Sequence, residues 1–154
     1  MIDIVLFQPE IPPNTGNIIR LCANTGSRLH LIEPLGFQID DRQLRRAGLD
    51  YRAFTDIRKY RNWAEWENAH PSKRAVAFTT RASRFYDQFQ FAPGDALVFG
   101  PETRGLPEDV LAGFDPELRL RLPMVTQDRS LNLANTVAIA VYEVWRQAGF
   151  KGGA

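Results

Sequence analysis

The sequence begins with a strand–helix–strand pattern, which restricts the fold more than any other feature. Residues 2–7 and 29–32 are short apolar runs typical of buried strands. Between them, apolar residues from Ile18 to Cys22 are spaced as on one face of a helix, which Asn14 or Thr15 can cap and Gly26 can end. Strands joined through one helix are expected to lie parallel, connected by a right-handed crossover.

The rest of the chain continues to alternate between strands and helices. Further strands are expected at residues 74–79, 96–100 and 118–122, and further helices at 40–48, 62–69, 107–113 and 130–149. Residues 81–93 are rich in aromatic side chains and are expected to form a short helix and a loop. The alternation predicts an α/β fold in one domain, residues 1–154, with a mostly parallel sheet and helices on both faces.

The last of these helices has an unusual first turn. Its apolar residues lie three and four positions apart and predict one buried face, made of Ala134, Val137, Ala138, Val141, Val144, Trp145 and Ala148. Ser130 is expected to cap this helix, and Gly149 to end it. Asn132 and Asn135 are poor helix formers that lie where free backbone N–H groups can hold a polar ligand. Capping and solvation explain these residues equally well.

The charge of the chain is nearly balanced but unevenly distributed. A net charge of +1 argues against a protein that binds nucleic acid by bulk charge alone. Basic residues nevertheless gather in the second quarter of the chain and predict a local basic surface. They are Arg42, Arg45, Arg46, Arg52, Arg58, Lys59 and Arg61. A solvated face explains most of them equally well.

Several classes of site are excluded by the remaining residues. The only cysteine, Cys22, lies in an apolar helical run, so we expect neither a disulfide nor a cysteine metal cluster. His30 and His70 are far apart in the sequence and share no ligand spacing, so we expect no metal site. Asp3 interrupts the N-terminal apolar run, so we expect a strand and not a signal peptide there. No segment is long enough to span a bilayer. We therefore expect a cytoplasmic protein.

Polar, glycine-containing loops follow three of the expected strands. They are residues 14–20, residues 100–105 and the turn around Ser130. Ligands of open α/β sheets bind beyond the carboxyl ends of the strands, and glycines let a ligand approach the backbone. Each loop alone is explained by a turn and a helix cap, whereas the three together favour a pocket. Glycine motifs typical of dinucleotide, nucleoside-triphosphate and hydrolase sites are absent from the sequence.

These three segments, in this order, resemble the SPOUT class of RNA methyltransferases. Asn14–Arg20 is similar to the first motif of that class, Phe99–Pro107 to the second, and Leu122–Asn135 to the third. The resemblance extends over essentially the whole chain. Within the class, residues 9–17 and 44–51 are similar to the small tRNA 2′-O-methyltransferases that act on the wobble nucleotide, cytidine or a modified uridine, of leucine tRNAs.

The resemblance implies a fold, a cofactor and a set of site residues. It implies a C-terminal trefoil knot that holds S-adenosylmethionine, and a homodimer with the site near the subunit interface. The implied cofactor-binding residues are Phe78, Thr79, Gly100, Glu102, Leu122 through its backbone, and Ser130. The implied catalytic residue is Arg20. Methylation of ribosomal RNA, or a non-catalytic RNA-binding module that has kept the pocket, are the alternatives.

The chemistry of ribose methylation suggests how these residues act. A guanidinium stays charged in proteins, so Arg20 is expected to stabilise the developing alkoxide and not to act as a base. Arg42, Arg45 and Arg46, with Asn17, are expected to contact the anticodon stem-loop of tRNA. Ile139 and Tyr142 lie off the apolar face of the last helix and are candidates for contact with a second subunit.

Overall fold

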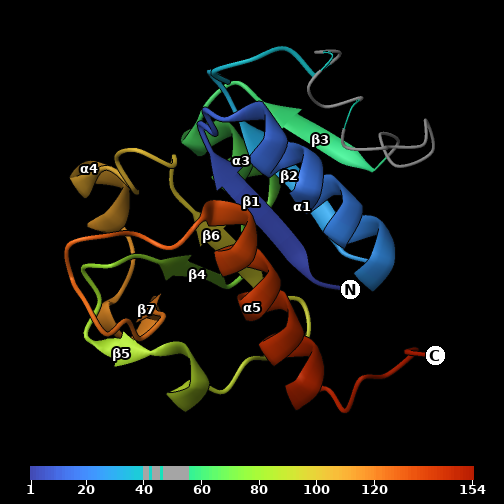
Figure 1. Cartoon of the computed structure of the whole chain (residues 1–154), viewed down its shortest axis with the longest axis vertical. Coiled ribbons are helices and arrows are strands. Elements are labelled where there is room, and N and C mark those ends of the chain that lie inside the picture. Colours follow the sequence, from blue (N-terminus) through green and yellow to red (C-terminus); the bar gives the residue numbers. More distant parts are fainter. Residues whose placement is uncertain (40–41, 43–45, 47–55) are drawn as a thin grey trace.

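The structure is a computed structural model that describes residues 1–39, 42, 46 and 56–154 (Figure 1). Its strands are β1 (Asp3–Phe7), β2 (Arg28–Ile32), β3 (Ile57–Tyr60), β4 (Ala75–Phe78), β5 (Arg84–Phe85), β6 (Ala96–Phe99) and β7 (Arg119–Arg121). Its helices are α1 (Pro12–Thr25), α3 (Trp63–Ala69), α4 (Glu108–Leu111) and α5 (Leu133–Gln147), with the short 3-10 helices η2 (Tyr86–Gln88) and η3 (Pro116–Leu118). The strands form one sheet in the order β3-β2-β1-β6-β4-β7-β5.

All strand pairs among the described residues are parallel, as the alternating pattern predicts. Helices cover both faces of the sheet. On one face, α1 and α5 lie side by side (Figure 1) and bury Ile18, Ile19, Val137 and Val141 against the strands. On the other face, Trp66 of α3 and residues of the α4 segment form a second apolar core. The carboxyl ends of β4, β6 and β7 therefore lie between two layers of helices.

The first strand–helix–strand unit forms as predicted except at the start of its helix. Helix α1 begins at Pro12, with Ile11 in the N-cap position and no side-chain cap. Asn14 and Thr15 are therefore buried inside the helix, and the prediction that one of them caps it is wrong. Proline is favoured in the first turn of a helix because its missing N–H has no partner there in any case. The helix ends as predicted, with Gly26 in the left-handed conformation.

Two strands were not predicted, and both lie at an edge of the sheet. Strand β3 is only partly buried, and its central residues, Arg58 and Lys59, are exposed. Strand β5 has two residues and pairs with β7 at the opposite edge. Neither segment carries the apolar run or clean alternation by which a strand is identified in sequence. The helix expected at residues 40–48 lies, apart from Arg42 and Arg46, outside the described residues.

Helix α5 begins two residues later than expected. Asn132, not Ser130, is its N-cap, and the Asn132 side chain accepts a hydrogen bond from the backbone N–H of Asn135 (3.2 Å). Both residue types cap helices well, so the sequence alone does not choose between them. The buried face includes Ala134, Val137, Ala140 and Val141, whereas Ala148 is exposed. Among the described residues, no helix is long and apolar enough to cross a membrane.

Candidate functional site

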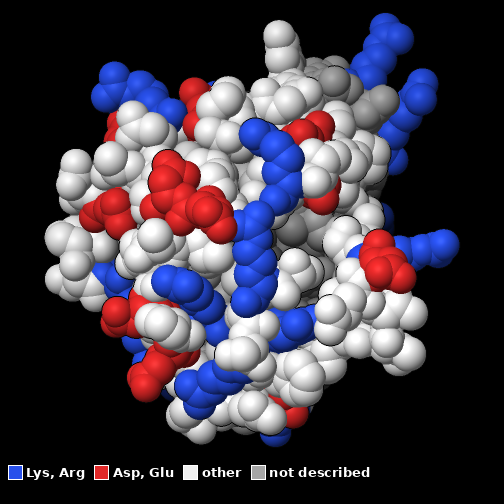
Figure 2. All heavy atoms as spheres, turned by 90° about the vertical axis from the view of Figure 1, so that its left-hand side faces the viewer, with Lys and Arg blue, Asp and Glu red and all other residues white. Residues whose placement is uncertain are grey.

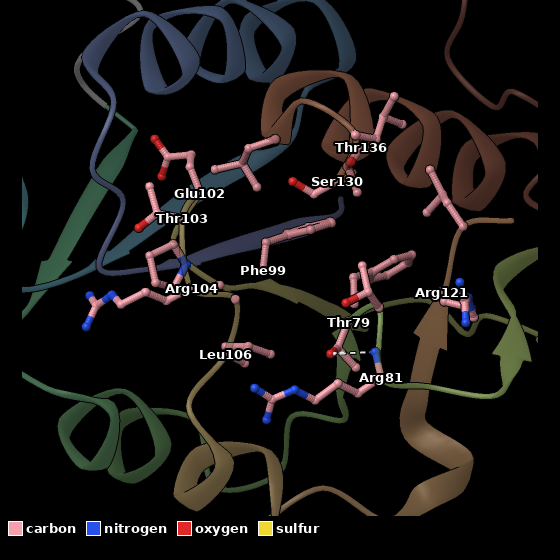
Figure 3. A pocket seen from close by; sticks show the side chains of 18 of the residues that line it. Thr79, Arg81, Phe99, Glu102, Thr103, Arg104, Leu106, Arg121, Ser130 and Thr136 are labelled. Atoms are coloured by element: carbon pink, nitrogen blue, oxygen red, sulfur yellow. Dashed lines mark hydrogen bonds between the residues drawn. The ribbon is translucent and has the colours of Figure 1, made fainter. Parts of the chain in front are cut away.

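A cavity of about 260 Å³ opens where the carboxyl ends of β4, β6 and β7 meet the start of α5 (Figure 3). It is lined by residues 78–81, 99–106, 121–122, 124, 130–131, 133 and 136. The residues predicted to bind a cofactor all line it: Phe78, Thr79, Gly100, Glu102, Leu122 and Ser130. The volume is close to the lower end of the range of about 300–1,000 Å³ that is typical of small-molecule sites.

The adjoining strand ends supply an apolar wall of this cavity. Phe78 of β4 pairs in register with Phe99 of β6, and their rings stack with centroids 4.9 Å apart. Directly beyond the strand, the backbone N–H of Thr79 donates to the carbonyl of Leu120 in β7 (2.9 Å). The parallel register thus fixes both phenylalanines at the ligand-binding edge of the sheet.

The loop from Gly100 to Leu106 folds back onto its own beginning. A Cβ atom at Gly100 would lie 2.2 Å from the backbone nitrogen of Leu106, so no larger residue fits this turn. Gly105 has a φ of +67°, which favours glycine, and its N–H donates to the carbonyl of Pro101 (2.9 Å). The path of the loop itself therefore requires Gly100, and the expected close approach of a ligand to this backbone stays a prediction.

Two glutamates join this loop to the segment before α1. The Glu102 carboxylate accepts hydrogen bonds from the backbone N–H groups of Glu10 (2.9 Å) and Ile11 (2.5 Å), the residues just before the helix. In return, one Glu10 carboxylate oxygen accepts from the backbone N–H (3.1 Å) and the hydroxyl (2.7 Å) of Thr103. The hydrogen bonds from Thr103 lower the pKa of Glu10. A negative group at this place also suits the positive end of the α1 dipole.

The third segment is joined to the same group of residues through two asparagines. The Asn14 side-chain amide donates to Glu102 (3.4 Å), and its carbonyl oxygen accepts from the Asn132 amide (2.9 Å). Asn14 is buried, so these bonds form away from bulk water. The three segments singled out in the sequence therefore converge in space. The second segment (residues 100–105) and the turn around Ser130 line the cavity. The first segment does not line it but contacts the other two through Asn14.

Several cavity residues were not predicted. Thr136 lies in the first turns of α5, and Met124 and Leu131 flank the turn that contains Ser130. Arg81, Arg104 and Arg121 also line the cavity. Figure 3 shows Glu102 and Thr103 on one side of the cavity and Arg121 on the other. Arg104 lies within the second of the three segments, whereas Arg81, Arg121 and Thr136 lie outside all three, so no signal in the sequence indicated them.

The residues predicted to act on RNA lie outside the cavity lining. Asn17 and Arg20 are exposed on α1, and Arg42 and Arg46 are also exposed. Arg45 lies outside the described residues. Figure 2, which turns the left-hand side of Figure 1 toward the viewer, shows Lys and Arg side chains down the middle of that face, with acidic groups beside them. Basic and acidic side chains are therefore interspersed on this face.

The lining suits an amphipathic ligand with a flat ring system. Leucines, Met124 and stacked phenylalanines supply apolar surface, while the hydroxyls of Thr79, Ser130 and Thr136 and the backbone of the Gly100 loop supply hydrogen-bonding groups. This donor set fits the adenosyl part of S-adenosylmethionine. The Glu102 carboxylate bonds to the segment before α1 and so holds the loop in place, while its predicted contact with the cofactor stays a prediction.

A second polar cluster lies at the opposite, amino-terminal end of β1. His30 is fully buried, and its Nε2 lies 2.9 Å from Asp3, whose other oxygen pairs with Lys73. Trp66 Nε1 donates to His30 Nδ1 (3.3 Å), so Nδ1 carries no proton and His30 is neutral. The His30 and His70 rings, far apart in the sequence, have centroids 5.2 Å apart. Among the described residues, no group of three or more His, Cys, Asp or Glu side chains could hold a metal ion.

Comparison with known proteins gives consistent matches over the full chain. The sequence profile of the SpoU rRNA Methylase family matches residues 1–142. A Burkholderia ambifaria protein named tRNA (cytidine(34)-2′-O)-methyltransferase is 59% identical over 156 residues, covering 100% of both chains. The Escherichia coli K12 protein of the same name is 52% identical over 152 residues, covering 99% of this chain and 97% of its own.

A solved structure agrees with these sequence matches. It is described as giving structural insights into the 2-OH methylation of C/U34 on tRNA, and it superimposes with a TM-score of 0.90 at 45% identity, covering 98% of each chain.

Proposed function

We propose that this chain, which belongs to the SpoU rRNA Methylase family, methylates the ribose 2′-oxygen of the wobble nucleotide in tRNA, using S-adenosylmethionine. The names of the relatives support cytidine at position 34 as a substrate. We extend the proposal to a modified uridine at that position and to leucine tRNAs. The observation that carries the cofactor assignment is that every residue predicted to bind S-adenosylmethionine lines one cavity.

The cavity residues have distinct proposed roles in holding the cofactor. The backbone around Phe78, Thr79, Gly100 and Leu122 and the hydroxyl of Ser130 hold the adenosyl part. S-adenosylmethionine supplies the methyl group on an electrophilic sulfonium. The protein therefore needs mainly to align the ribose hydroxyl, and alignment of well-oriented partners can contribute about 7–11 kcal/mol. Membership of the family implies that the chain around this cavity forms the trefoil knot.

Arg20 is the proposed catalytic residue. It is exposed on α1, the helix whose N-terminal end is fixed by Glu102 and whose Asn14 contacts the start of α5. Its permanent positive charge stabilises the negative charge that develops on the ribose 2′-oxygen. A phosphate or a water molecule takes the proton, because a guanidinium cannot. The Glu102 and Asn14 contacts thus fix the helix that carries Arg20 relative to the cavity.

The substrate surface and the assembly complete the proposal. Asn17, Arg42, Arg45 and Arg46 contact the anticodon stem-loop. The 154 residues form one domain, which pairs into a homodimer in the cytoplasm. Ile139 and Tyr142 are 37% and 46% exposed on α5, as contact residues of a second subunit would be in an isolated chain. A monomer in sedimentation experiments at micromolar concentration would contradict the dimer.

Ribosomal RNA is the second candidate substrate, because the matching family is described by rRNA methylation. One experiment separates these candidates and also the non-catalytic alternative. The purified protein is incubated with methyl-labelled S-adenosylmethionine and total RNA, and the labelled nucleosides are mapped. We expect 2′-O-methylcytidine and a 2′-O-methylated modified uridine at position 34 of leucine tRNAs. Label in ribosomal RNA, or no label, would contradict the proposal.

A further inference from the structure

Arg121, the last residue of β7, has a buried donor without a partner. The side chain is half-buried and lines the cavity, and its Nε makes no hydrogen bond. Only one other buried side-chain N or O atom among the described residues lacks a partner, the hydroxyl of Thr15. Of these two atoms, only that of Arg121 belongs to a permanently charged group.

Other charged groups that are buried near strand ends have partners. Asp95 binds Arg74 (2.6 Å), and Asp3 binds His30 and Lys73. Arg119 provides the closest comparison, because it lies two residues before Arg121 on the same side of β7. The Arg119 Nε and one terminal nitrogen donate to the carbonyl of Phe114, at 3.0 and 2.6 Å. The absence of such a partner therefore distinguishes Arg121 from its neighbour on the strand.

No carboxylate of the cavity compensates the Arg121 charge. Glu102 is the acidic residue of the lining, and both its oxygens accept hydrogen bonds from the segment before α1. Figure 3 shows Glu102 on the side of the cavity away from Arg121. A guanidinium that lines a cavity without a carboxylate partner is suited to bind a ligand there. The ligand that suits it is an oxyanion, which a guanidinium binds through two parallel hydrogen bonds.

We propose that Arg121 binds the carboxylate of the amino-acid part of S-adenosylmethionine. The proposal rests on the proposed function, which places this cofactor in the cavity. Because the half-buried Arg121 side chain lines the cavity, an anion held inside the cavity lies beside it, which favours a cofactor carboxylate over an RNA phosphate. Repulsion between the guanidinium and the sulfonium directs the carboxylate, and not the sulfur, toward Arg121.

Two ligands that differ in the amino-acid part test this assignment. S-adenosylhomocysteine carries the carboxylate, whereas 5′-methylthioadenosine keeps the adenosyl part and lacks the amino acid. Dissociation constants for both are measured by calorimetry on the wild-type protein and on Arg121→Gln. We expect affinity for S-adenosylhomocysteine to fall by about 10- to 100-fold, the effect of losing a charge-assisted hydrogen bond. Affinity for 5′-methylthioadenosine should stay within about twofold, because it makes no contact that the substitution removes.

Two further variants control for charge and for folding. Arg121→Lys keeps the charge but not the two-pronged geometry, so it should recover only part of the affinity. Arg119→Gln removes a charge from the same side of the same strand outside the cavity lining, so it should weaken neither ligand selectively. Melting temperatures of all variants are compared with that of the wild type.

The other outcomes overturn the inference in distinguishable ways. Equal loss of both ligands in Arg121→Gln would assign Arg121 a structural role. Unchanged affinity for S-adenosylhomocysteine together with weaker tRNA binding would assign it to an RNA phosphate. In both cases, binding of the two ligands to the wild-type protein would still support S-adenosylmethionine as the cofactor. If the wild-type protein bound neither ligand, the proposed function would fall together with the inference.

Discussion

The side-chain amide of Asn132 donates a hydrogen bond to the side-chain carbonyl of Asn14 (2.9 Å), although 118 positions separate them in the chain. Asn14 in turn donates to Glu102 (3.4 Å), whose carboxylate binds the segment before α1. Asn132 also caps α5. One small network therefore fixes the helix that carries Arg20, the Gly100 loop and the start of α5 relative to one another.

Replacing Glu102 tests the importance of this network. In Glu102→Gln the side chain keeps a single acceptor oxygen, and its NH₂ group faces a backbone N–H donor. We expect the free energy of unfolding in urea to fall by about 1–3 kcal/mol, and cofactor affinity to fall with it. Glu108→Gln is the matched control, because the Glu108 side chain is 89% exposed. Equal stability of the two variants would show that the network contributes nothing.

Replacing Arg20 tests the proposed catalytic step. Because Arg20 is not among the cavity-lining residues, Arg20→Ala should leave the dissociation constant of S-adenosylhomocysteine unchanged. The turnover number should fall by about 100- to 1,000-fold, as when an oxyanion-stabilising donor is removed. Single-turnover methylation of tRNA gives the rate, and Lys151→Ala, at an exposed site, serves as the control. Wild-type turnover by Arg20→Ala would refute the role.

The basic surface is tested by the salt dependence of tRNA binding. Arg42→Ala with Arg46→Ala should weaken tRNA binding and reduce the slope of log affinity against log salt by about 0.7–0.9 for each phosphate that is no longer neutralised. The companion pair, Arg45→Ala with Arg46→Ala, should act in the same direction. Filter binding at several salt concentrations measures both quantities. An unchanged slope would show that these arginines are solvated and contact no tRNA phosphate.

The buried His30 predicts a dependence of stability on pH. Burial lowers the pKa of His30 below its ordinary 6.5, despite the hydrogen bond to Asp3. The unfolded chain therefore takes up a proton below pH 6.5 that the folded chain resists, so stability is complete above pH 6.5 and falls below it. Burial would raise the pKa of Asp3, but the hydrogen bonds from His30 and Lys73 leave it below 3.8, so further stability is lost below that pH.

Urea unfolding at a series of pH values checks this dependence. Between pH 6.5 and 5, the free energy of unfolding should fall with a slope of at most about 1.4 kcal/mol per pH unit from this one group. The slope should shrink in His30→Gln, which has no titrating ring. A flat wild-type profile over this range would contradict the assignment of a neutral, buried His30.

The sequence predicted the parts of the site that follow from the order of strands and helices along the chain. The strand ends at Phe78, Gly100 and Leu122 follow from apolar runs and punctuating residues, and parallel pairing brings them to one edge. The resemblance to SPOUT methyltransferases was confirmed by the family match and by the relatives. The roles of the individual site residues stay predictions.

Contacts between particular side chains could not be predicted where several residues of the sequence could make them. Ser130 and Asn132 are equally good caps, and only the three-dimensional position of Asn14 favours Asn132. The contact between His30 and His70 requires β2 and α3 to be adjacent, which their sequence spacing does not reveal. The unpaired Arg121 is visible only once every neighbour has been placed.

The most direct test of the proposed function is a crystal structure of the protein with S-adenosylhomocysteine. We predict that the adenosyl part lies in the cavity between the ends of β4, β6 and β7 and the start of α5, in contact with Thr79, Gly100 and Ser130. Density for the ligand at another place on the protein, or an empty cavity at saturating ligand, would contradict the central claim.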